Sequence, residues 1–436
     1  MRYLRRAPWG IHGDALVNMG PWELVAEIAS GAMGTVYLAR GRGANRARVA
    51  AVKRLHPHLE SEMAFVRMFM DEARLARRIA SRHVVETYEL LEDAGHHAIA
   101  MRYVEGGSLA ALARAHWIRN VALPPAIGLR IVHDTLLGLD AAHEAKGETG
   151  ERLDIVHRDV SPQNVLVDLD GYSQLTDFGV ARARGRLHST YGQQVKGKLR
   201  YLAPEQLRDA RVDRRADIFS AGIVLWELLV GAQLFDGDDD VAIMRNVLIM
   251  AVPPPSARGA RIPLAIDRLC LRALSRDPGR RYATAREFAQ AIHATGMMAP
   301  REEVSQLVRA VFGDDTARCR KTLARPLRPS AGASAVWAAL AALFLALLAA
   351  GAGAWLHFRH PPAPPDASTA NPPAVKTRDL PASASATAPP LEPLSPPTAT
   401  PPSSSATARH RDAAPRAPKP SSSTRATPGA YIPETL

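Results

Sequence analysis

The chain has 436 residues, a hydrophobic fraction of 47% and a formal net charge of +12, so it can hold one large domain with extensions and a substantial core. Its two cysteines, Cys270 and Cys319, belong to no CxxC or Cys/His cluster, which argues against a zinc site and a disulfide framework. The charge fits either an anionic partner or an arginine-rich composition; because the basic residues are scattered, we favour the second and expect no nucleic-acid partner.

The predicted elements begin with strands. Residues 1–21 form an N-terminal extension without an apolar run, so no signal peptide is predicted there. Strand-like stretches follow at 22–29, 35–40 and 48–55. An amphipathic helix is predicted at 61–80, and a strongly apolar helix at 217–231 ends at a glycine. This order predicts a small strand-rich lobe followed by a larger helical one.

Residues 335–356 form a run of 22 residues without a charge. As a helix this run would be about 33 Å long, enough to cross a bilayer core of about 30 Å. Trp337 and Trp355 lie near its ends, where interfacial tryptophans are favoured. We predict one transmembrane helix; the alternative is a buried alanine-rich core helix.

The charges that flank this run predict its orientation. Residues 293–334 read as a basic juxtamembrane segment, and more basic residues precede the run than follow it: Arg318, Arg320, Lys321, Arg325 and Arg328 against Arg359. The positive-inside rule places the N-terminal domain in the cytoplasm and the C-terminal tail outside. We therefore expect a single-pass protein of the inner (cytoplasmic) membrane.

The tail, residues 357–436, is rich in Pro, Ala, Ser and Thr and holds more than half of the 34 prolines. It cannot bury enough apolar surface to offset chain entropy, so we expect it to be disordered. The tail could contact the cell wall or act only as a spacer, and the sequence does not decide between these two roles. Homodimerisation through the span is also open, although Gly351 and Gly353 lack the GxxxG spacing.

A glycine-bearing turn joins the first two predicted strands. Glycines in such a turn let backbone N–H groups approach phosphate oxygens closely. The turn alone is weak evidence, because Ala29 stands where a GxGxxGxV pattern has its first glycine. The candidate nucleotide-contacting residues here are Ile28, Ala29, Ser30, Gly31, Gly34 and Val36.

Lys53 lies within the apolar strand at 48–55, in the sequence Ala-Val-Lys. A lysine there is costly unless it is paired. The phosphates of a nucleotide and Glu72, from the following helix, would supply the pairing. Read one at a time, a snorkelling lysine and a solvated glutamate are equally good interpretations.

Four further motifs follow in order. The sequence His157-Arg158-Asp159-Val160-Ser161-Pro162-Gln163-Asn164 directly precedes an apolar strand, and Asp177-Phe178-Gly179 lies 13 residues after Asn164. Ala203-Pro204-Glu205 closes the next segment, and Asp217-Ile218-Phe219-Ser220-Ala221-Gly222 opens the apolar helix. Farther on, Arg281 ends a D-P-x-x-R sequence that begins at Asp277.

These motifs resemble those of the bacterial eukaryotic-like (Hanks-type) serine/threonine protein kinases over residues 22–292. The resemblance implies an α+β, bilobal kinase fold, with a β-rich N-lobe that carries an αC helix and a larger helical C-lobe. ATP would bind in the cleft between the lobes. The protein would transfer its γ-phosphate to Ser/Thr hydroxyls of protein substrates, autophosphorylate and act in membrane-tethered signalling.

The resemblance also assigns roles to single residues. Asp159 would accept the substrate hydroxyl proton, and Lys53 with Glu72 would hold the α- and β-phosphates. Asn164 and Asp177 would bind Mg²⁺, with Mn²⁺ as an alternative. Asp217 would brace the catalytic loop, Arg281 would pair with Glu205, and the adenine pocket would comprise Ala51, Met101, the hinge residue Val104 and Leu166.

The chain departs from the family at two supporting positions. Ser161 stands where these kinases have a lysine that contacts the γ-phosphate, and Lys198 stands where they have a threonine. We hypothesise that the two positions have exchanged roles, so that Lys198 supplies the catalytic cation and Ser161 the hydrogen bond. The alternative is that Lys198 points into solvent.

Other functions stay open beside kinase activity. These departures, with Ala29, make a pseudokinase that binds ATP without catalysis the main alternative. A purely structural membrane anchor explains only the C-terminal part. Ser189 and Thr190 are candidate phosphate acceptors. The basic residues of this segment would favour acidic substrates or form a solvated face: Arg182, Arg184, Arg186, Lys196, Lys198 and Arg200.

Overall fold

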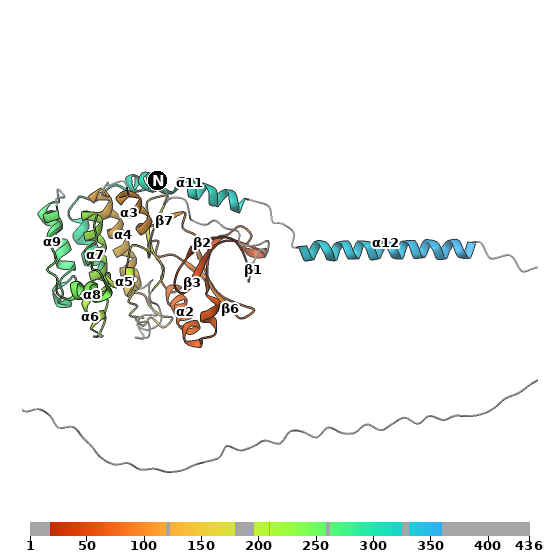
Figure 1. Ribbon diagram of the computed structural model, residues 1–436, viewed down its shortest axis with the longest axis horizontal. Helices are drawn as coiled ribbons and strands as arrows, with labels where there is room; N and C mark the ends of the chain where they lie inside the picture. Colours follow the sequence, from red (N-terminus) through yellow and green to blue (C-terminus); the bar gives the residue numbers. More distant parts are fainter. Residues whose placement is uncertain are drawn as a thin grey trace, which may run out of the picture. The chain divides into compact units, whose positions relative to one another are not determined.

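The computed structural model describes residues 18–118, 123–178, 196–208, 210–258, 262–324 and 331–359. The N-terminal part is a six-stranded antiparallel sheet in the order β1-β2-β3-β4-β6-β5, with helices beside it (Figure 1). Its elements are β1 (Asn18–Met19), β2 (Trp22–Ser30), β3 (Gly34–Gly41), η1 (Gly43–Asn45), β4 (Val49–Leu55), α1 (Pro57–Glu60), α2 (Met63–Ala76), β5 (Thr87–Asp93) and β6 (His96–Arg102).

The C-terminal part is mainly helical, as predicted. A small sheet of β7 (Gly106–Ser108), β8 (Val165–Asp168) and β9 (Ser173–Leu175) lies at its junction with the N-lobe. The helices are α3 (Leu109–Trp117), α4 (Pro125–His143), α5 (Lys196–Leu199), α6 (Pro204–Leu207), α7 (Arg215–Val230), α8 (Asp240–Ile249), η3 (Pro255–Arg258), α9 (Leu264–Ala273), η4 (Pro278–Arg280), α10 (Ala285–His293), α11 (Arg301–Leu323) and α12 (Ala331–Arg359).

The N-lobe core lies on both faces of the sheet. Trp22 is fully buried on one face, and its indole N–H donates to Glu89 over 2.6 Å. On the other face, α2 packs Phe69 and Val66 against the sheet. Val66, Phe69 and Glu72 follow one another at intervals of three residues, so they lie on the same face of α2. The packing of this face on the sheet brings Glu72 towards β4.

The C-lobe core is built around α7, which is buried on nearly all sides. Its apolar residues all around the helix explain the strongly hydrophobic stretch in the sequence. The helix ends at Gly231, whose φ of 75° suits glycine best. The predicted helix at 217–231 is therefore confirmed, with its start two residues earlier.

Helix α11 lies beyond the predicted kinase domain and packs on it beside β7 (Figure 1). Val304, Val308 and Phe312 are buried and belong to the C-lobe core. A Cβ on Gly107 would lie 2.5 Å from the Phe312 ring, so β7 needs a glycine where the ring rests on it. The segment at 293–334, predicted from its charge to be juxtamembrane, is in large part this docked helix.

Polar contacts tie α11 to both lobes. Ser305 donates to the carbonyl of Leu169 over 2.6 Å, and Arg320 pairs with Glu105 next to the hinge. At its end, the carbonyl of Leu323 accepts a hydrogen bond of 3.1 Å from Arg40 of β3. The helix therefore connects the C-lobe, the hinge and the N-lobe sheet.

The segment predicted to cross a membrane folds as part of α12. Within the described ranges, however, no helix is both long and apolar enough to span a membrane, so the predicted transmembrane helix at 335–356 is not supported. Alanine and glycine fill much of this segment, and they add far less membrane affinity per residue than leucine or phenylalanine. The predicted tail falls almost wholly outside the described residues.

Candidate active site

The glycine-bearing turn closes the β2–β3 hairpin. Gly31 N–H donates to the Gly34 carbonyl over 2.9 Å, and Ala29 pairs with Val36 across the hairpin. A Cβ on Gly34 would lie 2.2 Å from the backbone oxygen of Arg54, so only glycine allows this approach to β4. The hairpin carries all the predicted turn residues: Ile28, Ala29, Ser30, Gly31, Gly34 and Val36.

The predicted adenine pocket is assembled from neighbouring strands. Ala51 lies opposite Met101 in the β4–β6 register and, two residues from Lys53, shares its face of the strand. Val104 is buried in the segment after β6, and Leu166 lies on β8. Ala51 and Met101 are thus neighbours on adjacent strands, and the adenine-binding role of the four residues stays a prediction.

Lys53 connects the two lobes electrostatically. Its Nζ lies 2.6 Å from Oδ1 of Asp177 and 3.8 Å from Oε1 of Glu72. Burial works to lower the pKa of Lys53, but the carboxylates of Asp177 and Glu72 outweigh it and raise that pKa. The lysine therefore stays protonated; Glu72 is the partner predicted for it, whereas its shorter contact with Asp177 was not predicted.

Burial raises the pKa of Glu72 to about 7, although the charge of Lys53 works in the opposite direction. The glutamate side chain is only 9% exposed. Its charge state therefore changes near neutral pH, whereas an exposed glutamate would be ionised throughout that range.

Asp177 has a left-handed backbone with φ of 56°, a conformation that non-glycine residues rarely adopt. Burial opposes its ionisation, but the charge of Lys53 and a hydrogen bond from it hold the pKa of Asp177 below its usual range. The next residue, Phe178, packs on His157 with ring centroids 4.6 Å apart. Gly179, Ser189 and Thr190 lie outside the described residues, as do Arg182, Arg184 and Arg186.

Asp159 is held by its own loop. Asn164 Nδ2 donates to the Asp159 carbonyl over 2.8 Å and to its Oδ2 over 2.9 Å. The aspartate is 9% exposed, so it is largely buried but not completely closed off from solvent. Because one side-chain amide fixes both backbone and carboxylate, Asp159 has a defined orientation before any substrate binds.

Asp217 braces this loop, as predicted. Its carboxylate accepts hydrogen bonds of 2.8 Å from the backbone N–H groups of His157 and Arg158. Arg158 has φ of 62°, so the brace supports a strained turn directly before Asp159. A third bond of 2.8 Å comes from His143 on α4, a residue that no sequence motif had indicated.

Glu205 and Arg281 form the predicted ion pair. The guanidinium of Arg281 donates to both carboxylate oxygens of Glu205, over 2.7 and 2.9 Å. The Arg281 side chain is fully buried. This bidentate pair fixes the end of the segment that leads from the active site to α7.

Lys198 lies beside the catalytic loop. Its Nζ is 2.6 Å from Oδ2 of Asp159, so it does not point away into solvent. The hydroxyl of Ser161 is fully buried, and among the described residues it has no hydrogen-bond partner. The structure thus places the Lys198 cation as the exchange hypothesis requires. It does not show the hydrogen bond that the same hypothesis assigns to Ser161.

The donor atoms fit a magnesium–nucleotide complex. Asn164 and Asp177 offer amide and carboxylate oxygens, the hard ligands that Mg²⁺ prefers. In the described part of the chain no three His, Cys, Asp or Glu residues form a metal cage of their own. Magnesium that is bound together with phosphates needs only one or two protein ligands.

Comparisons with known proteins support one family. A family model of the protein kinase domain matches residues 22–293. Tyrosine-protein kinase MasK of Myxococcus xanthus is 38% identical over 63% of this chain and 42% of its own length. Serine/threonine-protein kinases PknL and PknE of Mycobacterium tuberculosis are 36% and 34% identical over 60% and 67% of this chain. The chain belongs to the protein kinase family.

The match covers 62% of PknL and 49% of PknE, so less than two thirds of each of these relatives is represented. Among solved structures, the kinase domain of Mycobacterium tuberculosis PknI is 29% identical over 64% of this chain and 97% of its own, with a TM-score of 0.48. What is shown for this chain is thus a protein kinase domain with a β-rich N-lobe and a helical C-lobe.

Proposed function

We propose that the chain transfers the γ-phosphoryl group of ATP to serine and threonine hydroxyls of proteins. The observation that carries this proposal is the arrangement around Asp159. Its carboxylate contacts an amide donor from Asn164 at 2.9 Å and a cation from Lys198 at 2.6 Å. A carboxylate held in this way at a cleft can orient a hydroxyl and take its proton.

In the proposed reaction the substrate hydroxyl oxygen attacks the γ-phosphorus. A new P–O bond forms, the bond from the γ-phosphorus to the β–γ bridging oxygen breaks, and ADP leaves with that electron pair. Asp159 takes the hydroxyl proton. Because this transfer requires little covalent help, positioning and charge stabilisation supply most of the catalysis.

The remaining site residues would position ATP. Lys53, kept in place by Glu72, would bind the α- and β-phosphates. Asn164 and Asp177 would hold Mg²⁺ or Mn²⁺, which neutralises phosphate charge when it is bound. In the structure Lys53 contacts Asp177 at 2.6 Å, so the groups that would share the nucleotide already lie together.

Phosphate transfer can be measured directly on the full chain. With γ-labelled ATP and Mg²⁺, we expect the label to appear on the chain itself and on an added protein substrate. Asp159→Asn should abolish this labelling while its thermal unfolding curve stays close to wild type. Labelling of the Asn variant at the wild-type rate would overturn the proposal.

Two alternatives are tested by the same experiment. The likeness to MasK, which is named a tyrosine-protein kinase, makes phosphotyrosine a second candidate product; phosphoamino-acid analysis of the labelled chain decides between them. The buried hydroxyl of Ser161, which has no hydrogen-bond partner among the described residues, and the missing glycine at Ala29 favour the pseudokinase alternative. ATP binding without label transfer would establish it.

Location, autophosphorylation sites and assembly stay predictions. The expected location at the inner membrane, with the kinase domain in the cytoplasm and the tail outside, is supported by the flanking charges alone. Cell fractionation and protease accessibility of the tail would test it. Wall contact and homodimerisation have no further support.

A further inference from the structure

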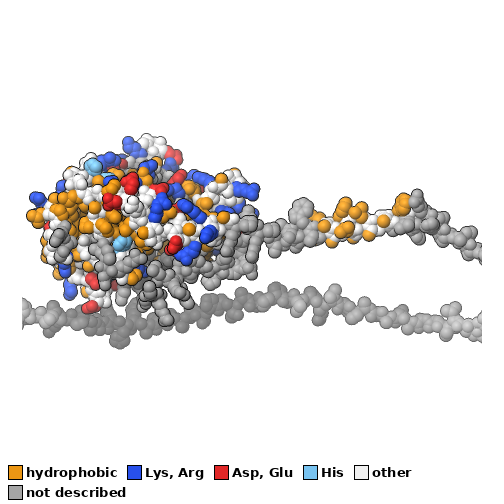
Figure 2. All heavy atoms as spheres, turned by 90° about the horizontal axis from the view of Figure 1, so that it is seen from above, with side chains coloured by type: hydrophobic (Ala, Val, Ile, Leu, Met, Phe, Trp, Pro, Cys, Tyr) orange, Lys and Arg blue, Asp and Glu red, His pale blue; other side chains and the backbone are white. Residues whose placement is uncertain are grey.

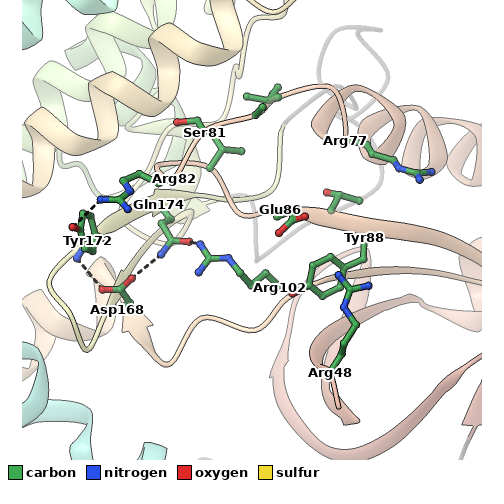
Figure 3. A pocket seen from close by; sticks show the side chains of 14 residues that line it. Arg48, Arg77, Ser81, Arg82, Glu86, Tyr88, Arg102, Asp168, Tyr172 and Gln174 are labelled. Carbon is green, nitrogen blue, oxygen red and sulfur yellow. Dashed lines mark hydrogen bonds between the residues drawn. The ribbon is translucent and has the colours of Figure 1, made fainter. Parts of the chain in front are cut away.

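A cavity of about 820 Å³ is lined by residues of both lobes (Figure 3). On β6, Met101 belongs to the predicted adenine pocket, whereas its neighbour Arg102 lines this cavity. Successive residues of a strand point to opposite faces, which explains the separation. None of the predicted nucleotide, metal or catalytic residues is among its lining.

The cavity has walls from both lobes. Arg48, directly before β4, and Tyr88 on β5 come from the N-lobe, and Tyr172 and Gln174 come from the turn and strand after β8. The basic residues in its lining are Arg48, Arg77, Arg82 and Arg102. Within the described part of the chain, none of these arginines forms a salt bridge with a carboxylate.

Aromatic rings hold two of these arginines in place. The guanidinium of Arg48 lies 4.3 Å from the centroid of Tyr88, and that of Arg82 lies 4.5 Å from the centroid of Tyr172. Arg82 also donates to the Tyr172 hydroxyl over 2.8 Å. Stacking on a ring leaves the N–H edge of a guanidinium available, so less freedom is lost when it binds an anion.

The acidic residues of the lining do not neutralise this charge. Asp168 accepts hydrogen bonds from the backbone N–H of Tyr172, over 2.8 Å, and from Gln174, over 2.9 Å. Arg102 donates to the same Gln174, so an amide lies between it and the carboxylate. Glu86 is the other acidic residue of the lining, against four arginines.

We propose that this cavity docks a segment of a protein substrate that carries several clustered negative charges, acidic or phosphorylated. That the bound protein is a substrate rests on the proposed kinase function. The binding of an anionic segment in the cavity does not depend on that function. The arginines are spread over a cavity too large for one phosphate, which favours a chain with several anionic groups.

A nucleic acid fits the cavity less well. Tyr88 is stacked by Trp22, 6.1 Å away, as well as by Arg48, and Tyr172 is contacted by Arg301 as well as by Arg82. The two rings therefore offer no free face on which a base could stack. On the face drawn in Figure 2, Lys and Arg side chains are mixed with acidic ones and form no continuous basic track.

Binding can be measured without ATP on the full chain, by fluorescence anisotropy with a labelled hexaglutamate peptide. A peptide with phosphoserines in place of the glutamates separates the two sources of charge, and hexaglutamine is the neutral control. We expect both anionic peptides to bind and hexaglutamine not to bind. Affinity should fall as salt is added, because the arginines are largely exposed.

Reversing the charge of two cavity arginines tests whether the peptides bind in the cavity. The double variant Arg48→Glu/Arg82→Glu should weaken binding of the anionic peptides by about tenfold or more, since it replaces two charge-assisted contacts by repulsion. The matched control, Arg245→Glu/Arg268→Glu, makes the same charge change at exposed arginines of α8 and α9 and should stay within about twofold of wild type. The neutral variant Arg48→Gln/Arg82→Gln should fall between them.

Three results would overturn the proposal. These are no binding of either anionic peptide, equal loss in the cavity and control variants, or tighter binding of a single-stranded oligothymidine through the same arginines. The last result would replace the peptide by a nucleic acid.

The docking role has its own readout. A substrate peptide extended by hexaglutamate should have a lower KM than one extended by hexaglutamine, and Arg48→Glu/Arg82→Glu should remove this difference without a change in kcat. If the chain proves to have no kinase activity, the binding measurement still decides whether the cavity takes an acidic segment.

Discussion

The ammonium group of Lys198 lies 2.6 Å from Oδ2 of Asp159, although the two residues are 39 positions apart in the sequence. A charge-assisted contact of this length fixes the carboxylate and places a cation next to the expected reaction centre. The lysine that related kinases carry on the catalytic loop is replaced here by Ser161, whose position is fully buried. Lys198 is therefore the candidate to supply this cation.

Lys198→Ala should lower kcat by about a hundredfold, the usual effect of removing one electrostatic donor from a transition state. Initial-rate kinetics with saturating ATP and a peptide substrate would measure it. The double variant Lys198→Thr/Ser161→Lys restores the family arrangement and should recover most of the loss. Near-normal turnover of Lys198→Ala would show that the contact has no catalytic role.

The raised pKa of Glu72, about 7, predicts a pH-dependent stability. Between its ordinary pKa of 4.5 and about 7, the folded chain keeps a proton on Glu72 that the unfolded chain has lost. Protonation in this window favours the folded state, so this contribution to the free energy of unfolding decreases as pH rises.

Glu72→Gln removes the titrating group. The variant should therefore gain stability relative to wild type as the pH is raised from the acid side of this window to above it, in urea unfolding without nucleotide. The exposed Glu92→Gln is the control and should follow the wild-type curve. A constant difference between Glu72→Gln and wild type at all pH values would contradict the pKa shift.

Arg281→Ala should destabilise the chain by about 3–5 kcal/mol, because it leaves the Glu205 carboxylate buried without its partner. The Arg281 side chain is fully buried, whereas that of its neighbour Arg280 is 82% exposed. Arg280→Ala is therefore a matched control and should change stability by less than about 1 kcal/mol. Chemical denaturation monitored by tryptophan fluorescence would measure both; equal effects would refute the prediction.

Phe312→Ala should loosen α11. Its ring is largely buried against Gly107, so we expect a loss of about 3 kcal/mol, near the lower end for buried phenylalanines. Hydrogen exchange of residues 301–323 should become faster, while α7 stays protected. Glu303→Gln, on the exposed side of the same helix, should leave exchange unchanged. Slow exchange of α11 in Phe312→Ala would show that the ring does not hold the helix in place.

The sequence predicted the contacts that depend on fixed motif spacing. Glu205 with Arg281, and Lys53 with Glu72, lie in motifs whose order and distances are characteristic of the family, and the structure brings each pair together. The contact of Lys198 with Asp159 agrees with the exchange hypothesis drawn from two departures, whose catalytic part stays a prediction. His143 could not be predicted, because its bond to Asp217 depends on how α4 packs against α7.

The packed helix α11 follows from periodicity in the sequence, whereas charge alone indicates only a basic segment. Residues 304, 308, 312 and 316 recur every fourth position and all are buried, which is the pattern of a helix with one packed face. The cavity had no such signal: its four arginines are scattered between residues 48 and 102, its other walls reach residue 174, and only the tertiary fold brings them together.

The docking of α11 also decides where the chain can be divided. The match to the family ends at residue 293, but Val304, Val308 and Phe312 complete the C-lobe core. A fragment that stops at 293 would expose the apolar surface that these side chains cover, and exposed surfaces of this kind promote self-association. A fragment that continues to residue 324 keeps that surface covered, so the soluble unit of this protein is longer than its family domain.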